Sequence, residues 1–339
     1  MAIFRFDGTP QGGQESQMCS YPIGLDPYRS GCSNSCSYCY VRHRLQDMGS
    51  WKVDGPSKLD VSHLSSLFEK VFKKNIISSK AARVIASRLP LRIGMNTDPF
   101  QRIEKDEHIT YDILKLLKHY KYPYTLLTKN CLVADDQYLT LYDRDISYLQ
   151  ITITTLNEEI SRRMEKGASI PRERLEAVRK LIGEKLRVAV RINPMFPIFP
   201  DGYYSSDAKS THLRALDVFS WDLVEQICEC KPSTVIVGFL RVESERTHRW
   251  LENEAGIDLR PYFWKHRNKK YYSREEIEVY YKKCKAICDA YRIPFTVCFD
   301  RNENYEYFKH MWANPADCCN GLNEIPCFTK TYNTLASEG

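Results

Sequence analysis

Short apolar segments alternate with amphipathic segments along most of the chain. The apolar segments have the length of buried strands, and the amphipathic ones repeat their apolar positions with helical spacing. Strand-like segments span 92–95, 124–127, 148–153, 186–192, 234–240 and 294–298, and helical patterns span 64–72, 111–117, 137–142, 157–182, 219–227 and 275–290. Strands that alternate with helices in this way form βα units around a parallel sheet, so the sequence predicts an α/β fold.

The number of these units narrows the architecture. About six units precede residue 245, which is too many for a small half-sheet and suits a barrel or a partial barrel. No convincing linker, repeat or low-complexity segment divides the chain. We therefore expect an N-terminal arm over 1–19, one core barrel over 20–245 and a C-terminal extension over 246–339.

The composition bears on the cellular compartment of the protein and, more weakly, on the charge of its substrate. The chain has 339 residues, 43% of them hydrophobic, which suffices for a sizeable core, and no apolar run approaches the ~20 residues of a membrane span. The start of the chain lacks the apolar core of a signal peptide. Its thirteen cysteines are thus expected to be reduced thiols and metal ligands of a cytoplasmic protein. The net charge of +6 permits a phosphate-bearing substrate without requiring one.

The most informative chemistry lies in a C-x3-C-x2-C loop made by Cys32, Cys36 and Cys39. Three thiolates this close can hold three irons of a [4Fe–4S] cluster and leave the fourth iron without a protein ligand. An iron open in this way resembles the open position of a catalytic metal. A structural zinc site or plain buried thiols are the alternatives, but no fourth ligand follows at zinc-finger spacing, since the next cysteine is Cys131.

This loop resembles the cluster loop of the radical S-adenosylmethionine (radical SAM) enzymes. The resemblance implies a partial (β/α)6 TIM-type barrel, open on one side, with a cysteine-rich C-terminal extension. It also implies that S-adenosylmethionine binds the open iron and that an electron from the cluster cleaves its S–C5′ bond to give a 5′-deoxyadenosyl radical. A low-potential donor of the flavodoxin or ferredoxin type would supply that electron. Tyr38, just before the third cysteine, fits the family position that packs near the adenine.

Two further segments resemble the branch of this family related to spore photoproduct lyase. Residues 96–104 resemble its T-D-P-x-Q-x-x-E stretch, and residues 163–175 resemble its R-x-E-x-G-A-x-x-P-x-x-R-L stretch. Because chemistry in such folds lies at the carboxyl ends of the strands, the residues that follow each strand are candidate cofactor contacts. The resemblance implies that Asp98 contacts the amino group of S-adenosylmethionine, that Lys129 contacts its carboxylate and that Thr152 places a hydroxyl near it. Glu165 and Arg174 would contact the cofactor or the barrel mouth. Asn193 is a candidate for bonding the ribose hydroxyls.

Each of these residues also has a structural interpretation that the sequence leaves open. Asp98 could cap a helix, Lys129 could be a surface lysine, and Glu165 with Arg174 could belong to a solvated helix face. The chain departs from spore photoproduct lyase at Met95, where that enzyme has its hydrogen-donating cysteine. A thioether has no S–H hydrogen to give, so repair of the spore lesion is not expected here.

The C-terminal extension holds more cysteines than packing needs. Cys298, Cys318, Cys319 and Cys327 form a candidate second metal site, either another [4Fe–4S] cluster or zinc, with Cys284 and Cys288 just upstream. Buried thiols are the alternative. Aromatic and cationic residues alternate over 262–272, a pattern that could stack bases and hold phosphates or form a basic surface loop.

The sequence therefore predicts a radical SAM enzyme that abstracts hydrogen from a substrate. A nucleic acid or nucleotide substrate is favoured by the branch and by the 262–272 segment. A peptide or small molecule, modified with the help of an auxiliary cluster, is the alternative favoured by the C-terminal cysteines and by Met95. A non-enzymatic metal protein that binds a partner is the second alternative.

Overall fold

The computed structural model describes residues 24–52, 55–198, 218–240, 242, 245–259, 274–298 and 307–311. The strands are β1 (Gly24–Leu25), β2 (Tyr28–Arg29), β3 (Ser57–Lys58), β4 (Leu91–Ile93), β5 (Tyr124–Thr128), β6 (Ser147–Thr152), β7 (Val188–Met195), β8 (Thr234–Phe239) and β9 (Phe295–Val297). The α-helices are α1 (Tyr40–Asp47), α2 (Val61–Phe72), α3 (Lys80–Ala86), α4 (Glu104–Glu107), α5 (Ile109–His119), α6 (Asp136–Leu139), α7 (Glu158–Met164), α8 (Pro171–Gly183), α9 (Trp221–Glu229), α10 (Glu245–Trp250) and α12 (Arg274–Ala290). Shorter helical segments are η1 (Cys131–Ala134), η3 (Leu251–Ala255) and η4 (Lys309–Met311).

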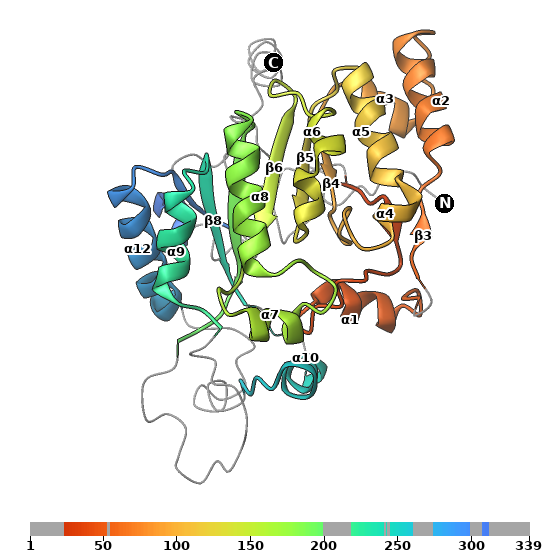
Figure 1. Ribbon diagram of the computed structural model, residues 1–339. Coiled ribbons are helices and arrows are strands. Elements are labelled where there is room, and N and C mark those ends of the chain that lie inside the picture. Colours follow the sequence, from red (N-terminus) through yellow and green to blue (C-terminus); the bar gives the residue numbers. More distant parts are fainter. Residues whose placement is uncertain are drawn as a thin grey trace, which may run out of the picture.

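Seven strands form one parallel sheet in the order β1-β4-β5-β6-β7-β8-β9. Each strand of this sheet pairs with the sheet strand that precedes it in the chain, so successive right-handed crossovers place the connecting helices on the same face. Figure 1 shows α5, α8, α9 and α12 in a row along the strands, while α1, α7 and α10 lie below them. In the described part of the chain the two edges, β1 and β9, are not paired with each other, and the expected partial TIM-type α/β fold is confirmed.

Alternation along the strands separates a helix-facing core from an inner face. In β6, Leu149 and Ile151 join the main core, whereas Tyr148 joins a small separate cluster with Ala189 of β7 and Ile236 of β8. Since side chains alternate along a strand, the residues at even spacing from Tyr148 also belong to this inner face. The inner face therefore continues from this apolar cluster toward the carboxyl ends of the strands, where the candidate site lies.

The structure corrects one predicted helix and shortens another. The helical pattern over 157–182 is two helices, α7 and α8, separated by a loop that contains Gly167. Pro171 is the first residue of α8, where its missing N–H costs nothing, and it cannot continue a preceding helix. The pattern over 137–142 gives the four-residue α6 followed by turns.

The C-terminal extension contributes to the barrel itself. Strand β9 pairs with β8, and α12 packs against α9, so the sheet continues beyond residue 245. Four features named from the sequence lie outside the described residues: the arm over 1–19, the segment 262–272, the pair Cys318 and Cys319, and Cys327. None of the described helices has both the length and the apolar composition needed to cross a membrane.

Candidate functional site

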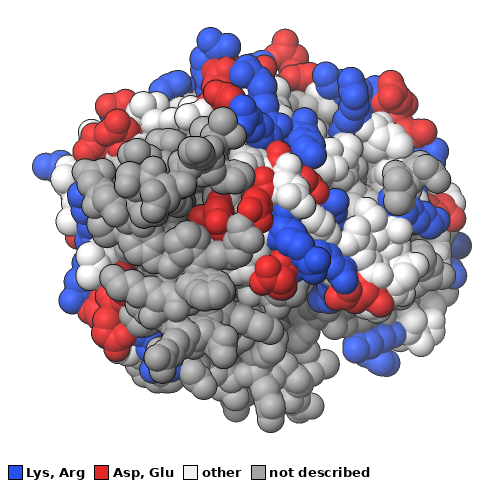
Figure 2. Space-filling model, turned by 90° about the horizontal axis from the view of Figure 1, so that it is seen from below, with Lys and Arg blue, Asp and Glu red and all other residues white. Residues whose placement is uncertain are grey.

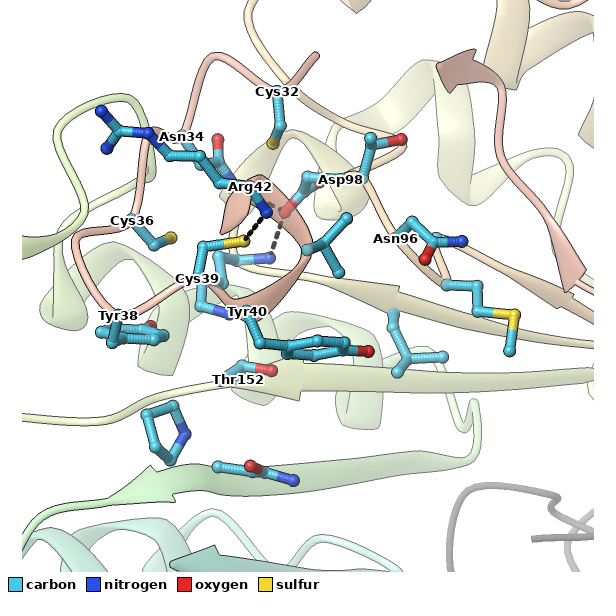
Figure 3. A pocket seen from close by; sticks show the side chains of 18 of the residues that line it. Cys32, Asn34, Cys36, Tyr38, Cys39, Tyr40, Arg42, Asn96, Asp98 and Thr152 are labelled. Atoms are coloured by element: carbon cyan, nitrogen blue, oxygen red, sulfur yellow. Dashed lines mark hydrogen bonds between the residues drawn. The ribbon is translucent and has the colours of Figure 1, made fainter. Parts of the chain in front are cut away.

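A cavity of about 350 Å³ lies at the carboxyl ends of the strands, within the size range of small-molecule sites. The cysteine loop forms one wall, and residues at or after the ends of β4, β5, β6, β7, β8 and β9 form the others (Figure 3). Eight residues singled out from the sequence line it together: Cys32, Cys36, Cys39, Tyr38, Asp98, Lys129, Thr152 and Asn193. The structure thus brings the predicted cluster loop and most of the predicted cofactor residues to one place.

The cysteine loop is closed by its own turns. The amide of Ser35 donates to the carbonyl of Cys32 at 3.3 Å, and the amide of Cys39 donates to the carbonyl of Cys36 at 3.2 Å. Cys39 also caps α1, since its sulfur accepts from the amide of Arg42 at 3.4 Å. The loop therefore places three thiols at one end of the cavity (Figure 3).

The donor set fits an iron–sulfur cluster. Burial raises the pKa of the Cys36 thiol, and it raises the pKa of Cys32 to about 12, to which the nearby charge of Asp98 contributes. A bound cation offsets that cost, because metal binding takes the thiol in its deprotonated form. Within the described ranges, no three cysteine, histidine or acidic side chains are gathered around one point as ligands of a single ion. Separate irons of a cluster need no such common point.

Asp98 holds the cysteine loop against two strands. One carboxylate oxygen accepts from the Thr128 hydroxyl at 2.7 Å and the Phe100 amide at 2.9 Å. The other accepts from the Asn34 amide group at 2.8 Å and the Lys129 backbone amide at 2.7 Å. These four bonds fill the acceptor sites of a carboxylate. Asp98 thus positions the cysteine loop in this structure, and its contact with the cofactor's amino group stays a prediction.

Gln101 and Glu104 of the T-D-P-x-Q-x-x-E segment also form structural hydrogen bonds. The Gln101 side chain accepts from the backbone amide of Ser33 at 2.9 Å, which fixes the first turn of the cysteine loop. Glu104 is fully buried and accepts from the Tyr138 hydroxyl at 2.7 Å and from the Tyr28 hydroxyl. The segment that follows β4 is therefore tied to the cysteine loop, to β2 and to α6.

Glu165 and Arg174 form an ion pair beneath the cysteine loop and do not line the cavity. Both side chains are almost completely buried. Glu165 also accepts from the Tyr38 hydroxyl, and Arg174 donates to the carbonyl of Thr152 at 3.0 Å. Burial alone would raise the pKa of Glu165, but the charges of Arg174 and Lys129 outweigh burial and lower it. The pair anchors Tyr38 to the end of β6 and so supports the cavity wall, while contact with the cofactor or the barrel mouth stays a prediction.

Replacing Arg174 with Met is expected to destabilise the fold by about 3–5 kcal/mol, because it leaves the carboxylate of Glu165 buried without its partner. Urea unfolding measures the loss. Arg162→Met is the control, since Arg162 pairs with Glu158 on the surface and its loss is worth about 0–1 kcal/mol. A double variant that also changes Glu165 to Leu should recover much of the stability. Equal losses in the two single variants would contradict this role of the pair.

The three remaining predicted residues lie on neighbouring strands or just after them. The Lys129 ammonium is 5.7 Å from the centre of the Tyr38 ring, next to the cysteine loop. Thr152 ends β6, and Asn193 lies in the last part of β7. A Cβ atom at Gly238 of β8 would come within 2.9 Å of the Asn193 side-chain nitrogen. Glycine at that position therefore leaves the amide of Asn193 room at the cavity wall.

Several residues that line the cavity were not placed in the site from the sequence. Tyr40, Arg92 and Arg191 line the cavity, and the signal that could have found the two arginines is a charge inside an otherwise apolar strand. Cys298, named for a candidate second metal site, also lines this cavity, and the second site itself stays a prediction. Cys288 packs 3.8 Å from Cys228 of α9 with no exposed surface, as expected of a buried thiol.

No protein-family model matches the chain. Among curated proteins, the uncharacterised proteins Rv2578c of Mycobacterium tuberculosis and Mb2609c of Mycobacterium bovis are each 25% identical to it over 183 residues. That match covers 52% of this chain and 50% of each relative, so the chain spans about half the length of the curated proteins it matches.

Solved structures show the fold more fully. Spore photoproduct lyase, as a double mutant with bound AdoMet and dinucleoside spore photoproduct, superposes with a TM-score of 0.52 at 14% identity over 85% of this chain and 79% of the lyase. Streptococcus suis SuiB bound to its precursor peptide SuiA gives 0.51 at 11% identity over 86% of this chain and 52% of SuiB. The fold is therefore that of the radical SAM enzymes, as the resemblance implied.

Proposed function

We propose that this chain, which has the radical SAM fold, is an enzyme that binds a [4Fe–4S] cluster and S-adenosylmethionine and abstracts hydrogen from a substrate. The observation that carries the proposal is the placement of the three thiols of the C-x3-C-x2-C loop at one end of a cavity at the carboxyl ends of the strands. Three thiolates leave one iron of a four-iron cluster for another ligand. When bound, the cluster and S-adenosylmethionine supply one-electron cleavage of the S–C5′ bond and removal of a hydrogen atom from a C–H bond.

The chain's own residues hold and orient this cofactor pair. Cys32, Cys36 and Cys39 would bind the cluster, and the loop's bonds to Asp98 and Gln101 keep the three sulfur atoms in place. Lys129 offers an ammonium group for the cofactor carboxylate. A bound substrate that covers the mouth of the cavity would limit access of water and of other hydrogen donors during the reaction.

The remaining lining residues orient the adenosyl half. Asn193 offers donors and an acceptor for the ribose hydroxyls, and Thr152 offers a hydroxyl beside it. The Tyr38 ring is fixed by Glu165 below it and by edge-on packing against Phe196 at 5.9 Å, which makes it a rigid neighbour for the adenine. A flavodoxin- or ferredoxin-type protein would supply the low-potential electron.

The substrate follows less directly from the fold. A nucleic acid or nucleotide is our first proposal, supported by the likeness to a lyase bound to a dinucleoside lesion. Modification of a peptide is the alternative, supported by the likeness to SuiB bound to its precursor peptide. Met95 lines the cavity and offers no S–H hydrogen, so the spore-lesion reaction itself is not part of the proposal.

Electron paramagnetic resonance of the anaerobically reconstituted, dithionite-reduced chain tests the binding step. We expect the spectrum of the reduced cluster to change when S-adenosylmethionine is added, because the cofactor becomes a ligand of the open iron. 5′-Methylthioadenosine, which lacks the amino and carboxylate groups, and a no-addition sample are the controls for non-specific effects. A cluster whose spectrum stays the same at saturating S-adenosylmethionine would count against the proposal and favour a structural metal protein.

A further inference from the structure

Two arginines point from buried strands into the cavity. Arg92 lies in β4 between Leu91 and Ile93, and Arg191 lies in β7 between Val190 and Ile192. These four apolar neighbours are fully buried in the main core. Because side chains alternate along a strand, both guanidinium groups lie on the inner face, and both line the cavity. Charged side chains are unusual on buried parallel strands, so their presence needs a reason.

The two arginines enter the cavity from separate strands. Arg191 donates to the side-chain oxygen of Gln150 at 3.0 Å and to the sulfur of Cys298 at 3.3 Å, which orients its guanidinium group. The Tyr40 hydroxyl lies within electrostatic reach of both Arg92 and Cys298. Tyr40 is 52% exposed, and Figure 3 shows its ring extending across the cavity, away from Cys36. Tyr40 thus lies near Arg92 and near the thiol of Cys298, which Arg191 contacts.

Cations outnumber anions among the described residues that line the cavity. Among the described residues that line it, Arg42, Arg92, Lys129 and Arg191 are cations, and Asp98 is an anion. Arg42 is neutralised by Glu254 at 3.2 Å. The oxygens of Asp98 accept four hydrogen bonds within the wall.

The surface on one face of the molecule is more mixed in charge. On the face that bears α1, α7 and α10, the described part of the surface shows lysines and arginines interspersed with acidic residues (Figure 2). A concentration of positive charge in an enclosed space attracts an anionic ligand more strongly than scattered surface charge does.

We propose that Arg92 and Arg191 bind an anionic group of the substrate, a phosphate or a carboxylate. This inference rests on the proposed function and names the chemistry that the substrate must have. Guanidinium groups match both anions with paired hydrogen bonds, and such bonds are stronger inside a cavity than in water. The anion would lie beside Tyr40, at the end of the cavity formed by β4, β7 and β9.

Isothermal titration of the reconstituted chain, anaerobic and saturated with S-adenosylmethionine, tests the site with inorganic phosphate and with succinate. Succinamide is the uncharged control. We expect at least one anion to bind the parent and to bind at least about tenfold more weakly to Arg191→Gln and to Arg92→Gln. Arg191→Lys should fall between, because it keeps the charge and loses the paired geometry. Arg83→Gln, on the exposed surface of α3, should bind as the parent does.

The outcomes separate this inference from the proposed function. Tighter phosphate binding indicates a phosphate-bearing substrate, and tighter succinate binding indicates a carboxylate; both support the site. Equal binding by the parent and the two Gln variants would overturn it, provided that urea unfolding shows all of them folded. Competition between the anion and S-adenosylmethionine in the parent would also overturn it, since the arginines would then hold the cofactor. A parent that binds anions but never cleaves S-adenosylmethionine would instead contradict the proposed function.

Discussion

Cys36→Ala is expected to abolish cleavage of S-adenosylmethionine and to lower the iron content from about four per chain toward none. Cys36 is one of three thiols that the C-x3-C-x2-C loop offers, and two thiolates cannot hold a four-iron cluster at this site. The iron content after anaerobic reconstitution and the 5′-deoxyadenosine formed with dithionite and S-adenosylmethionine measure the two effects.

Cys230→Ala is the matched control for this loss. Cys230 is a buried thiol at the end of α9 and does not line the cavity. Its replacement should leave the iron content and the amount of 5′-deoxyadenosine near those of the parent. A Cys36→Ala chain that keeps a full cluster and full cleavage would show that the cluster lies elsewhere.

Gly167→Ala is expected to displace the cysteine loop. A Cβ atom at Gly167 would lie 1.9 Å from the backbone oxygen of Ser33, a distance that no non-bonded pair tolerates. The Gly167 amide also donates to the carbonyl of Asn34 at 3.3 Å, so the two loops are already in contact. We expect a loss of about 1–3 kcal/mol in unfolding free energy. Iron should also be retained poorly, because the loop must move on the order of 1 Å to relieve the overlap.

Gly183→Ala provides the contrast on the same stretch of chain. Gly183 ends α8, and a Cβ atom there would meet nothing within 4 Å. Replacing this helical glycine should stabilise the fold by about 0.5–1 kcal/mol and leave iron content unchanged. If Gly167→Ala loads iron as well as Gly183→Ala does, the close approach of the two loops has no role in cluster binding.

The strands and the cysteine loop could be predicted from the sequence because both depend on local order. Tyr148, Leu149 and Ile151 give β6 its strand pattern within six positions. Cys32, Cys36 and Cys39 lie within eight. The resemblance then placed Lys129, Thr152 and Asn193 at the ends of strands, where the structure has them.

The roles of Asp98, Glu165 and Arg174 were not accessible in the same way. Asp98 bonds to Asn34, 64 positions away, and Glu165 bonds to Tyr38, 127 positions away. A motif shows that a carboxylate is present but not which donors satisfy it. Only the fold shows that these carboxylates hold the cysteine loop in place.

Arg92 and Arg191 illustrate a different limit. Each is a single charge inside an apolar segment, which the hydrophobic pattern absorbs without a change in the predicted strand. Both side chains enter one cavity because side chains alternate in direction along β4 and β7 and because the sheet curves around the cavity.

The most direct test of the central claim is whether the reconstituted parent chain, reduced with dithionite under anaerobic conditions, converts S-adenosylmethionine to 5′-deoxyadenosine and methionine. The proposal predicts 5′-deoxyadenosine that depends on both the reductant and the cluster. A chain that carries about four irons and, with S-adenosylmethionine and candidate phosphate- and carboxylate-bearing substrates present, still forms none would contradict it.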